Sequence, residues 1–152
     1  MTERAPRPET PREALLGQLR YLLVEVEALG PLLGRLPADA LTLALPGERS
    51  VLEALAHLAA LDRAALAAHL GGTEPPSAPP EPTAVPELGE ALGDVRAARE
   101  ALVAGFEAEA DWPDALRDLA LSIVHRDVEE LRRLAYRLHE SHITTRAIDL
   151  PK

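Results

Sequence analysis

Histidines are the residues of this sequence with the clearest capacity for chemistry. His139 and His142 lie three residues apart near the end of the chain, and His57 lies in an Ala/Leu-rich stretch. Neutral imidazole binds zinc, nickel, copper or iron(II), and three protein ligands leave one position open for water or substrate. A metal held by His57, His139 and His142 would lower the pKa of bound water and activate a nucleophile. The alternative for each histidine is a hydrogen-bonded structural role in the core or at its rim.

Other polar residues favour structural roles. Asp62 is expected to lie inside, paired with an arginine of a neighbouring helix rather than bound to metal. His69 suits a contact at the C-terminus of its helix. Trp112 is expected to close one end of the helix assembly rather than stack on a ligand. Glu129 and Arg133 have the spacing of a helical ion pair on a solvated face.

Several classes of protein are disfavoured by the composition. The chain has no cysteine, so thiolate catalysis and cysteine metal sites are excluded. It has no Gly-x-Ser-x-Gly elbow, phosphate loop, dinucleotide fingerprint or HExxH motif. The net charge of −9 speaks against nucleic-acid partners. No apolar run is long enough to span a membrane, and the polar N-terminus is no secretory signal, so a cytoplasmic protein is expected.

Helices must position these side chains, because Ala and Leu dominate and no strand pattern occurs. The first helix begins at a capping box of Thr10 and Glu13. It is predicted to kink or end at Gly30-Pro31, with a further turn or two to about Leu36. Residues 37–49 are expected to form an ordered loop with a short extended piece.

Three further helices are predicted. The second begins at a capping box of Ser50 and Glu53 and ends at Gly71-Gly72. The third spans about residues 87–110. The last runs from about 111 to 148, and because it is longer than the others, a break or kink is expected near 122–127.

Residues 71–86, GGTEPPSAPPEPTAVP, contain six prolines and cannot form a helix. Such a segment is stiff and spans roughly 40 Å, whereas a 20-residue helix spans about 30 Å. The second and third helices can therefore run parallel, joined by a crossover; a linker between two domains is the alternative. We predict a single all-α domain over residues 1–152, a four-helix bundle in up-down-down-up order, with residues 1–9 flexible.

The stretch PGERSVLEALAHLAALDRAAL, residues 46–66, resembles the DinB-like (YfiT-like) metalloenzyme family. Members typically read Gly-x-Trp-Ser-(apolar)-x-Glu-x-(apolar)-x-His-(apolar) at the start of the second helix. The matching residues are Gly47, Ser50, Val51, Glu53, Leu55, His57 and Leu58. Arg49 stands where the family has tryptophan. The resemblance implies a four-helix bundle with its second and third helices parallel, and His57 as the first metal ligand.

The last helix departs from the family pattern, in which two histidines lie four residues apart and glutamine often follows. If His142 fills the second place, Leu138 fills the first; if His139 fills the first, Ile143 fills the second. Either register loses one ligand unless the helix distorts. The expected glutamine is also missing.

Three functions follow from the residues and the resemblance together. The first is a metal-dependent hydrolase or thiol-linked transferase acting on a small molecule, with zinc or nickel as cofactor. The second is a non-catalytic bundle that has lost its metal and binds a small ligand or a protein partner. The third is an oligomeric scaffold, and the resemblance also implies a homodimer.

Overall fold

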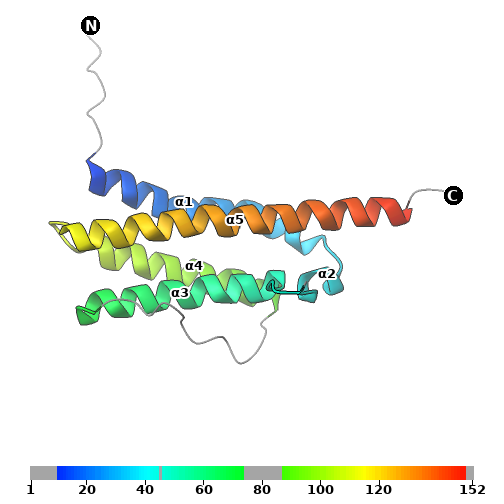
Figure 1. The fold of residues 1–152 in the computed structure, drawn as a ribbon, viewed down its shortest axis with the longest axis horizontal. Coiled ribbons are helices and arrows are strands. Elements are labelled where there is room, and N and C mark those ends of the chain that lie inside the picture. Colours follow the sequence, from blue (N-terminus) through cyan, green and yellow to red (C-terminus); the bar gives the residue numbers. More distant parts are fainter. Residues whose placement is uncertain (1–9, 45, 74–86, 150–152) are drawn as a thin grey trace, which may run out of the picture.

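The computed structural model describes residues 10–44, 46–73 and 87–149, the last of these without the side chains of 140–149 (Figure 1). The predicted flexible residues 1–9, and residues 74–86 of the predicted crossover, lie outside this range. The described chain is all-helical, which confirms the predicted class. Its helices are α1 (Pro11–Gly34), α2 (Ala38–Thr42), α3 (Val51–Gly71), α4 (Leu88–Glu107) and α5 (Asp114–Asp149). Within these described segments, no helix is both long and apolar enough to cross a membrane.

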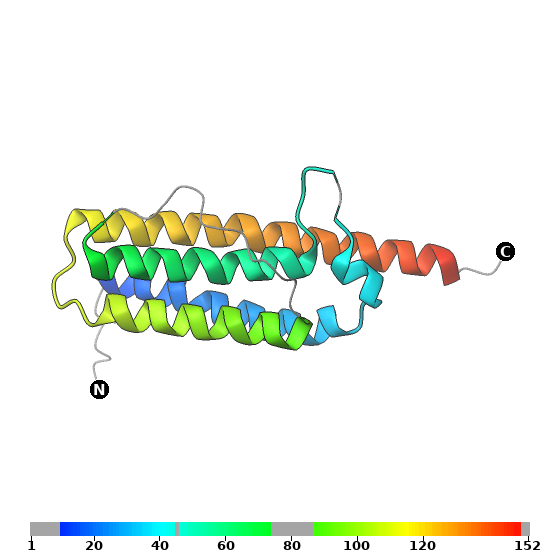
Figure 2. The ribbon, with the colours of Figure 1, turned by 90° about the horizontal axis from the view of Figure 1, so that it is seen from below.

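Four long helices lie side by side (Figures 1 and 2). α1 and α5 run in one direction, and α3 and α4 run in the opposite direction. The α3–α4 pair has the most extensive contact, α1 contacts both α4 and α5, and the contact between α3 and α5 is smaller than these. The end of α5 projects beyond the other helices (Figure 2).

Both predicted capping boxes are present. The side chain of Thr10 accepts a hydrogen bond from the Glu13 N–H at 3.1 Å, and Ser50 accepts one from the Glu53 N–H at 3.1 Å. In each pair the glutamate also accepts the N–H of the capping residue, which satisfies a second backbone donor. α3 ends at Gly72, whose φ of 69° lies in the left-handed region that favours glycine.

Two predicted boundaries differ from the structure, and a third agrees with it in part. α1 does not end at Gly30-Pro31 but continues past Pro31 to Gly34, close to the predicted end at about Leu36. Residues 37–49 contain a short helix, α2, in place of an extended piece, because Leu41 is buried against the core. α5 begins at Asp114 and continues through residues 122–127, so the expected break there is wrong. No proline or glycine interrupts this stretch.

The apolar interior forms two clusters of buried side chains. One includes Leu22, Leu55, Val95 and Leu134 and lies toward α2. The other includes Phe106 and lies toward the turn between α4 and α5. Trp112 packs against this second cluster and donates its indole N–H to the carbonyl of Phe106 at 3.0 Å. The predicted role of Trp112 in closing this end is confirmed.

Candidate functional site

A group of buried charges, the Arg99 cluster, lies between the two apolar clusters and joins all four long helices. It consists of Asp62 on α3, Arg99 on α4, and Arg126 and Asp127 on α5. Arg99 is 0% exposed and also donates to the carbonyl of Leu19 on α1 at 3.0 Å. This confirms the prediction that Asp62 pairs with arginines of neighbouring helices.

The hydrogen bonds of Arg99 use its whole donor capacity. Its guanidinium donates to Asp62 at 2.7 and 3.1 Å, and to Asp127 at 2.7 and 2.9 Å. With the Leu19 carbonyl this makes five bonds, which equals the number of N–H donors on a guanidinium. Arg126 donates to Asp62 at 2.7 Å, so two positive charges face two negative charges.

The pKa values in this cluster reflect the balance of burial and pairing. Burial disfavours the charged form of Arg99, but the hydrogen bonds to Asp127 and Asp62 outweigh it, and the pKa of Arg99 lies above its ordinary value. Burial raises the pKa of Asp127, against the lowering effect of Arg99 and Arg126. The cluster is enclosed and its central arginine is saturated, so its role is structural.

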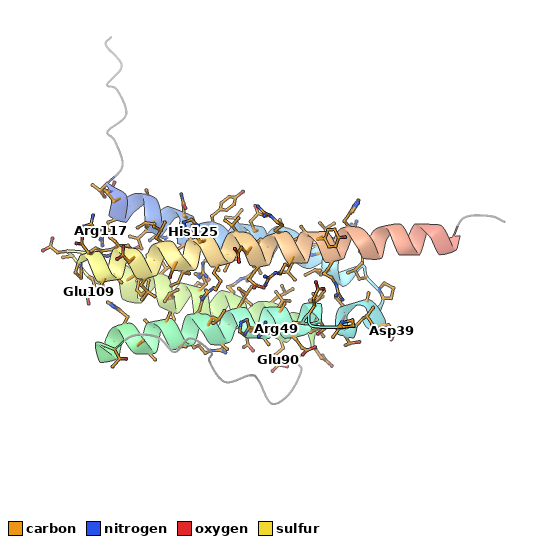
Figure 3. The ribbon with its side chains drawn as sticks, viewed as in Figure 1. Asp39, Arg49, Glu90, Glu109, Arg117 and His125 are labelled. Carbon is orange, nitrogen blue, oxygen red and sulfur yellow. The ribbon has the colours of Figure 1, made fainter. Side chains whose placement is uncertain are left out.

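A pocket of about 570 Å³ lies where the loop before α3 and the first turn of α3 face α5. Arg49, near the start of α3, lies far from Glu109 at the other end of the molecule (Figure 3). The charged residues on the pocket wall are Arg49, Arg132, Arg133, Arg137, Glu48 and Glu130. The pocket wall therefore carries four positive and two negative groups, in a chain whose net charge is −9.

Arg137 is the most buried of these arginines, with 12% of its side chain exposed, whereas the other three are exposed. One of its terminal nitrogens, Nη2, donates to the carbonyl of Leu43. The other, Nη1, lies 3.5 Å from a carboxylate oxygen of Glu48 and makes no hydrogen bond within the described chain. Arg133 pairs with Glu130 at 2.9 Å instead of with the predicted Glu129.

The predicted metal ligands can be placed by the register of α3 and α5, which run in opposite directions (Figure 1). Asp62 is bonded to Arg126, and Val51 and Arg137 line the same pocket. Asp62 on α3 therefore lies at the level of Arg126 on α5, and Val51 lies at the level of Arg137.

His57 lies on α3, half-buried, level with about residues 131–132 of α5. His139 is exposed and lies about 11 Å further along the axis, at a rise of about 1.5 Å per residue. The backbone of His142 lies about 15 Å beyond the level of His57, and its side chain is outside the described residues. The structure therefore does not bring the three histidines to one level, and the metal site stays a prediction.

No group of three or more His, Asp or Glu side chains that could hold a metal occurs among the side chains that the structure describes. His69 has a structural role as predicted, but with different partners. Its ring stands edge-on to Phe106, with centroids 5.1 Å apart, and its Nε2 lies 3.5 Å from Glu109. It therefore ties the end of α3 to the end of α4.

The sequence did not lead us to predict the pocket between the start of α3 and α5, or the arginines that line it. The run RDVEELRR suggested a solvated face, although Arg133 and Arg137 lie four residues apart and so share one side of a helix. Arg49, where the family has tryptophan, was the second available signal. Neither shows which distant segment covers that side of the helix.

Comparison with protein-family models finds no match, and comparisons with curated proteins and with solved structures likewise find none. The resemblance to the DinB-like family therefore rests on the motif of residues 46–66 alone.

Proposed function

We propose that this chain is a DinB-like four-helix bundle, in up-down-down-up order with a crossover through residues 71–86, that binds a small molecule in the pocket at the start of α3. The pocket carries this proposal. Its volume of about 570 Å³ lies within the range of about 300–1,000 Å³ that is usual for small-molecule sites.

The composition of the pocket wall supports the same function. Val51, Ala54 and Leu134 supply apolar surface, and Tyr136 supplies an aromatic ring with a hydroxyl. Typical ligand sites are lined mostly by apolar side chains. A small number of polar groups in them fix the orientation of the ligand. The shared direction of α3 and α4 supports the bundle order (Figure 2).

The second candidate is the metal-dependent hydrolase or thiol-linked transferase implied by the resemblance, with zinc or nickel held by His57, His139 and His142. His57, half-buried at the motif position, favours it. The turn of α5 level with His57 carries Leu131 and Arg132, which are not metal ligands. This offset favours the ligand-binding function, in which the metal site has been lost.

One experiment separates the two candidates. A set of small molecules is titrated into isotope-labelled protein and followed by backbone NMR, with Ala54→Leu as a variant whose larger side chain narrows the pocket. Ala101→Leu, an exposed change on α4, is the matched control. We expect shift changes around residues 47–54 and 130–137 that Ala54→Leu abolishes and Ala101→Leu preserves.

Metal content supplies the contrary outcome. Protein purified without chelator or affinity tag is analysed for zinc and nickel, alongside His57→Ala. Stoichiometric metal that is lost in His57→Ala, with no ligand response in the pocket, would overturn the binding function in favour of the enzyme. The homodimer, the cytoplasmic location and the absence of nucleic-acid partners remain parts of the proposal, and sedimentation analysis tests the first of these.

A further inference from the structure

The charge of the pocket differs from that of the protein around it. The chain carries 25 acidic and 16 basic residues. The pocket wall holds four arginines and two glutamates, so its formal charge is positive. A cavity whose walls carry a net charge attracts small ions of the opposite sign. This local reversal on an acidic protein indicates a preference for anions.

Arg137 provides the specific contact. Its side chain is mostly buried on the pocket wall, and its Nη1 makes no hydrogen bond in the described chain. The neighbouring Glu48 has 60% of its side chain exposed, so its carboxylate can turn toward solvent when a stronger acceptor arrives. Buried donors are normally satisfied, and a ligand oxygen would supply the missing acceptor.

The first turn of α3 adds to this attraction. Ser50 caps a helix of 21 residues that begins at Val51, and both residues line the pocket. Backbone N–H groups at a helix N-terminus point outward and carry partial positive charge. The first residues of α3 line the pocket together with arginines of α5, so the positive end of the α3 dipole adds to the attraction for an anion.

We propose that the pocket binds small molecules that combine a phosphate or carboxylate with an apolar body. Arg137, with Arg133 beside it, holds the anionic group through the paired N–H donors that suit phosphate and carboxylate oxygens. Val51, Ala54 and Leu134 contact the apolar body. The volume of about 570 Å³ exceeds what an inorganic ion fills. This inference rests on the proposed function and names its ligand class.

Isothermal titration with four probes tests the inference: phenyl phosphate, benzoate, benzyl alcohol and benzylamine. They share an aromatic body and differ in the charge of the head group. We expect the two anions to bind at least about tenfold more tightly than the neutral and cationic probes. Inorganic phosphate alone should bind more weakly than phenyl phosphate, and added NaCl should weaken both.

The variants assign the effect to the pocket. Arg137→Gln should weaken phenyl phosphate binding about tenfold or more, whereas Arg96→Gln, an exposed arginine of α4, should change it less than about twofold. Glu48→Gln should strengthen binding, because it removes a competing carboxylate. If Arg137→Gln does not fold, Arg133→Gln serves, since 68% of that side chain is exposed.

Two failures can be told apart. Equal binding of benzyl alcohol and phenyl phosphate in the pocket would overturn the anion preference and leave the binding function standing. Absence of binding by all four probes and by the wider set of small molecules would overturn both.

Discussion

Arginine serves two different purposes in two regions of this molecule. At the centre, Arg99 is fully buried and every N–H donor of its guanidinium is bonded to protein. In the pocket near the start of α3, Arg137 of α5 has 12% of its side chain exposed, and one of its terminal nitrogens makes no hydrogen bond in the described chain. A saturated arginine fixes the fold, and an unsaturated one on the wall of a cavity is suited to an external acceptor.

The partners differ in the same way. Asp62 and Asp127 are buried and come from two different helices, so the position of Arg99 fixes α3, α4 and α5 relative to one another. Glu48 is mostly exposed and lies on a loop. Our hypothesis is that the buried charges of the Arg99 cluster serve mainly to select one arrangement of the helices. Their contribution to the net free energy of folding is less clear.

The largest effect that tests this comparison is expected from Arg99→Met. It leaves two buried aspartates without their main partner, and we expect a loss of about 3–5 kcal/mol in the free energy of unfolding. Urea denaturation followed by circular dichroism measures this. Arg96→Met, exposed on the same helix, should stay within about 0.5 kcal/mol of the parent. A loss below about 1 kcal/mol in Arg99→Met would show that the Arg99 cluster does not hold the helices together.

Replacing the whole buried group sharpens the result. The variant Asp62→Leu/Arg99→Met/Asp127→Leu removes all three of these buried charges, so none is left without a partner. Arg126 can turn toward solvent, since 21% of its side chain is already exposed. We expect this triple variant to be more stable than Arg99→Met by about 1–4 kcal/mol. Urea midpoints of the two variants decide this. A triple variant as unstable as Arg99→Met would mean that the shape of the core, rather than charge pairing, sets the cost.

Arg137→Gln should have a much smaller effect on stability. It removes one hydrogen bond to the Leu43 carbonyl and one ion pair to an exposed glutamate, so we expect a loss of about 1 kcal/mol or less. Thermal unfolding of the ligand-free protein measures it. If the loss matched that of Arg99→Met, Arg137 would be a structural residue and the contrast between the two regions would disappear.

The smallest effect concerns pH. Because burial raises the pKa of Asp127, the folded protein holds this proton more tightly than the unfolded chain does. The stability that this group contributes is therefore present below its unfolded pKa and is lost as pH rises through its folded pKa. Urea unfolding at several pH values from about 3 to 7 should show this slope in the parent and not in Asp127→Asn. A parent curve that rises instead, relative to Asp127→Asn, would show that pairing with Arg99 outweighs burial.

Local signals in the sequence predicted much of the fold. Both capping boxes, the extent of α3 and the pairing of Asp62 with arginine follow from a few neighbouring residues or from one charge in an apolar stripe. α2 has only five residues and no side-chain cap, and its Leu41 is buried in the apolar cluster that the long helices form. No residue pattern close to α2 in the sequence predicts that Leu41 is buried there.

The histidines show a second limit. A helical wheel gives the direction in which a side chain points, and it does not give the height at which that side chain lies relative to another helix. That height depends on the turn between α4 and α5 and on how the Arg99 cluster aligns α3 with α5. The same register brings Val51 opposite Arg137, which forms the pocket.

The paired charges of the Arg99 cluster separate the two apolar clusters of the interior, which we call the two compartments. Side chains of one compartment cannot slide across to fill a void in the other without displacing paired charges. A ligand seated against Val51 and Leu134 touches only the compartment near α2. Its occupancy should therefore slow local opening in that half of the protein more than around Phe106 and Trp112.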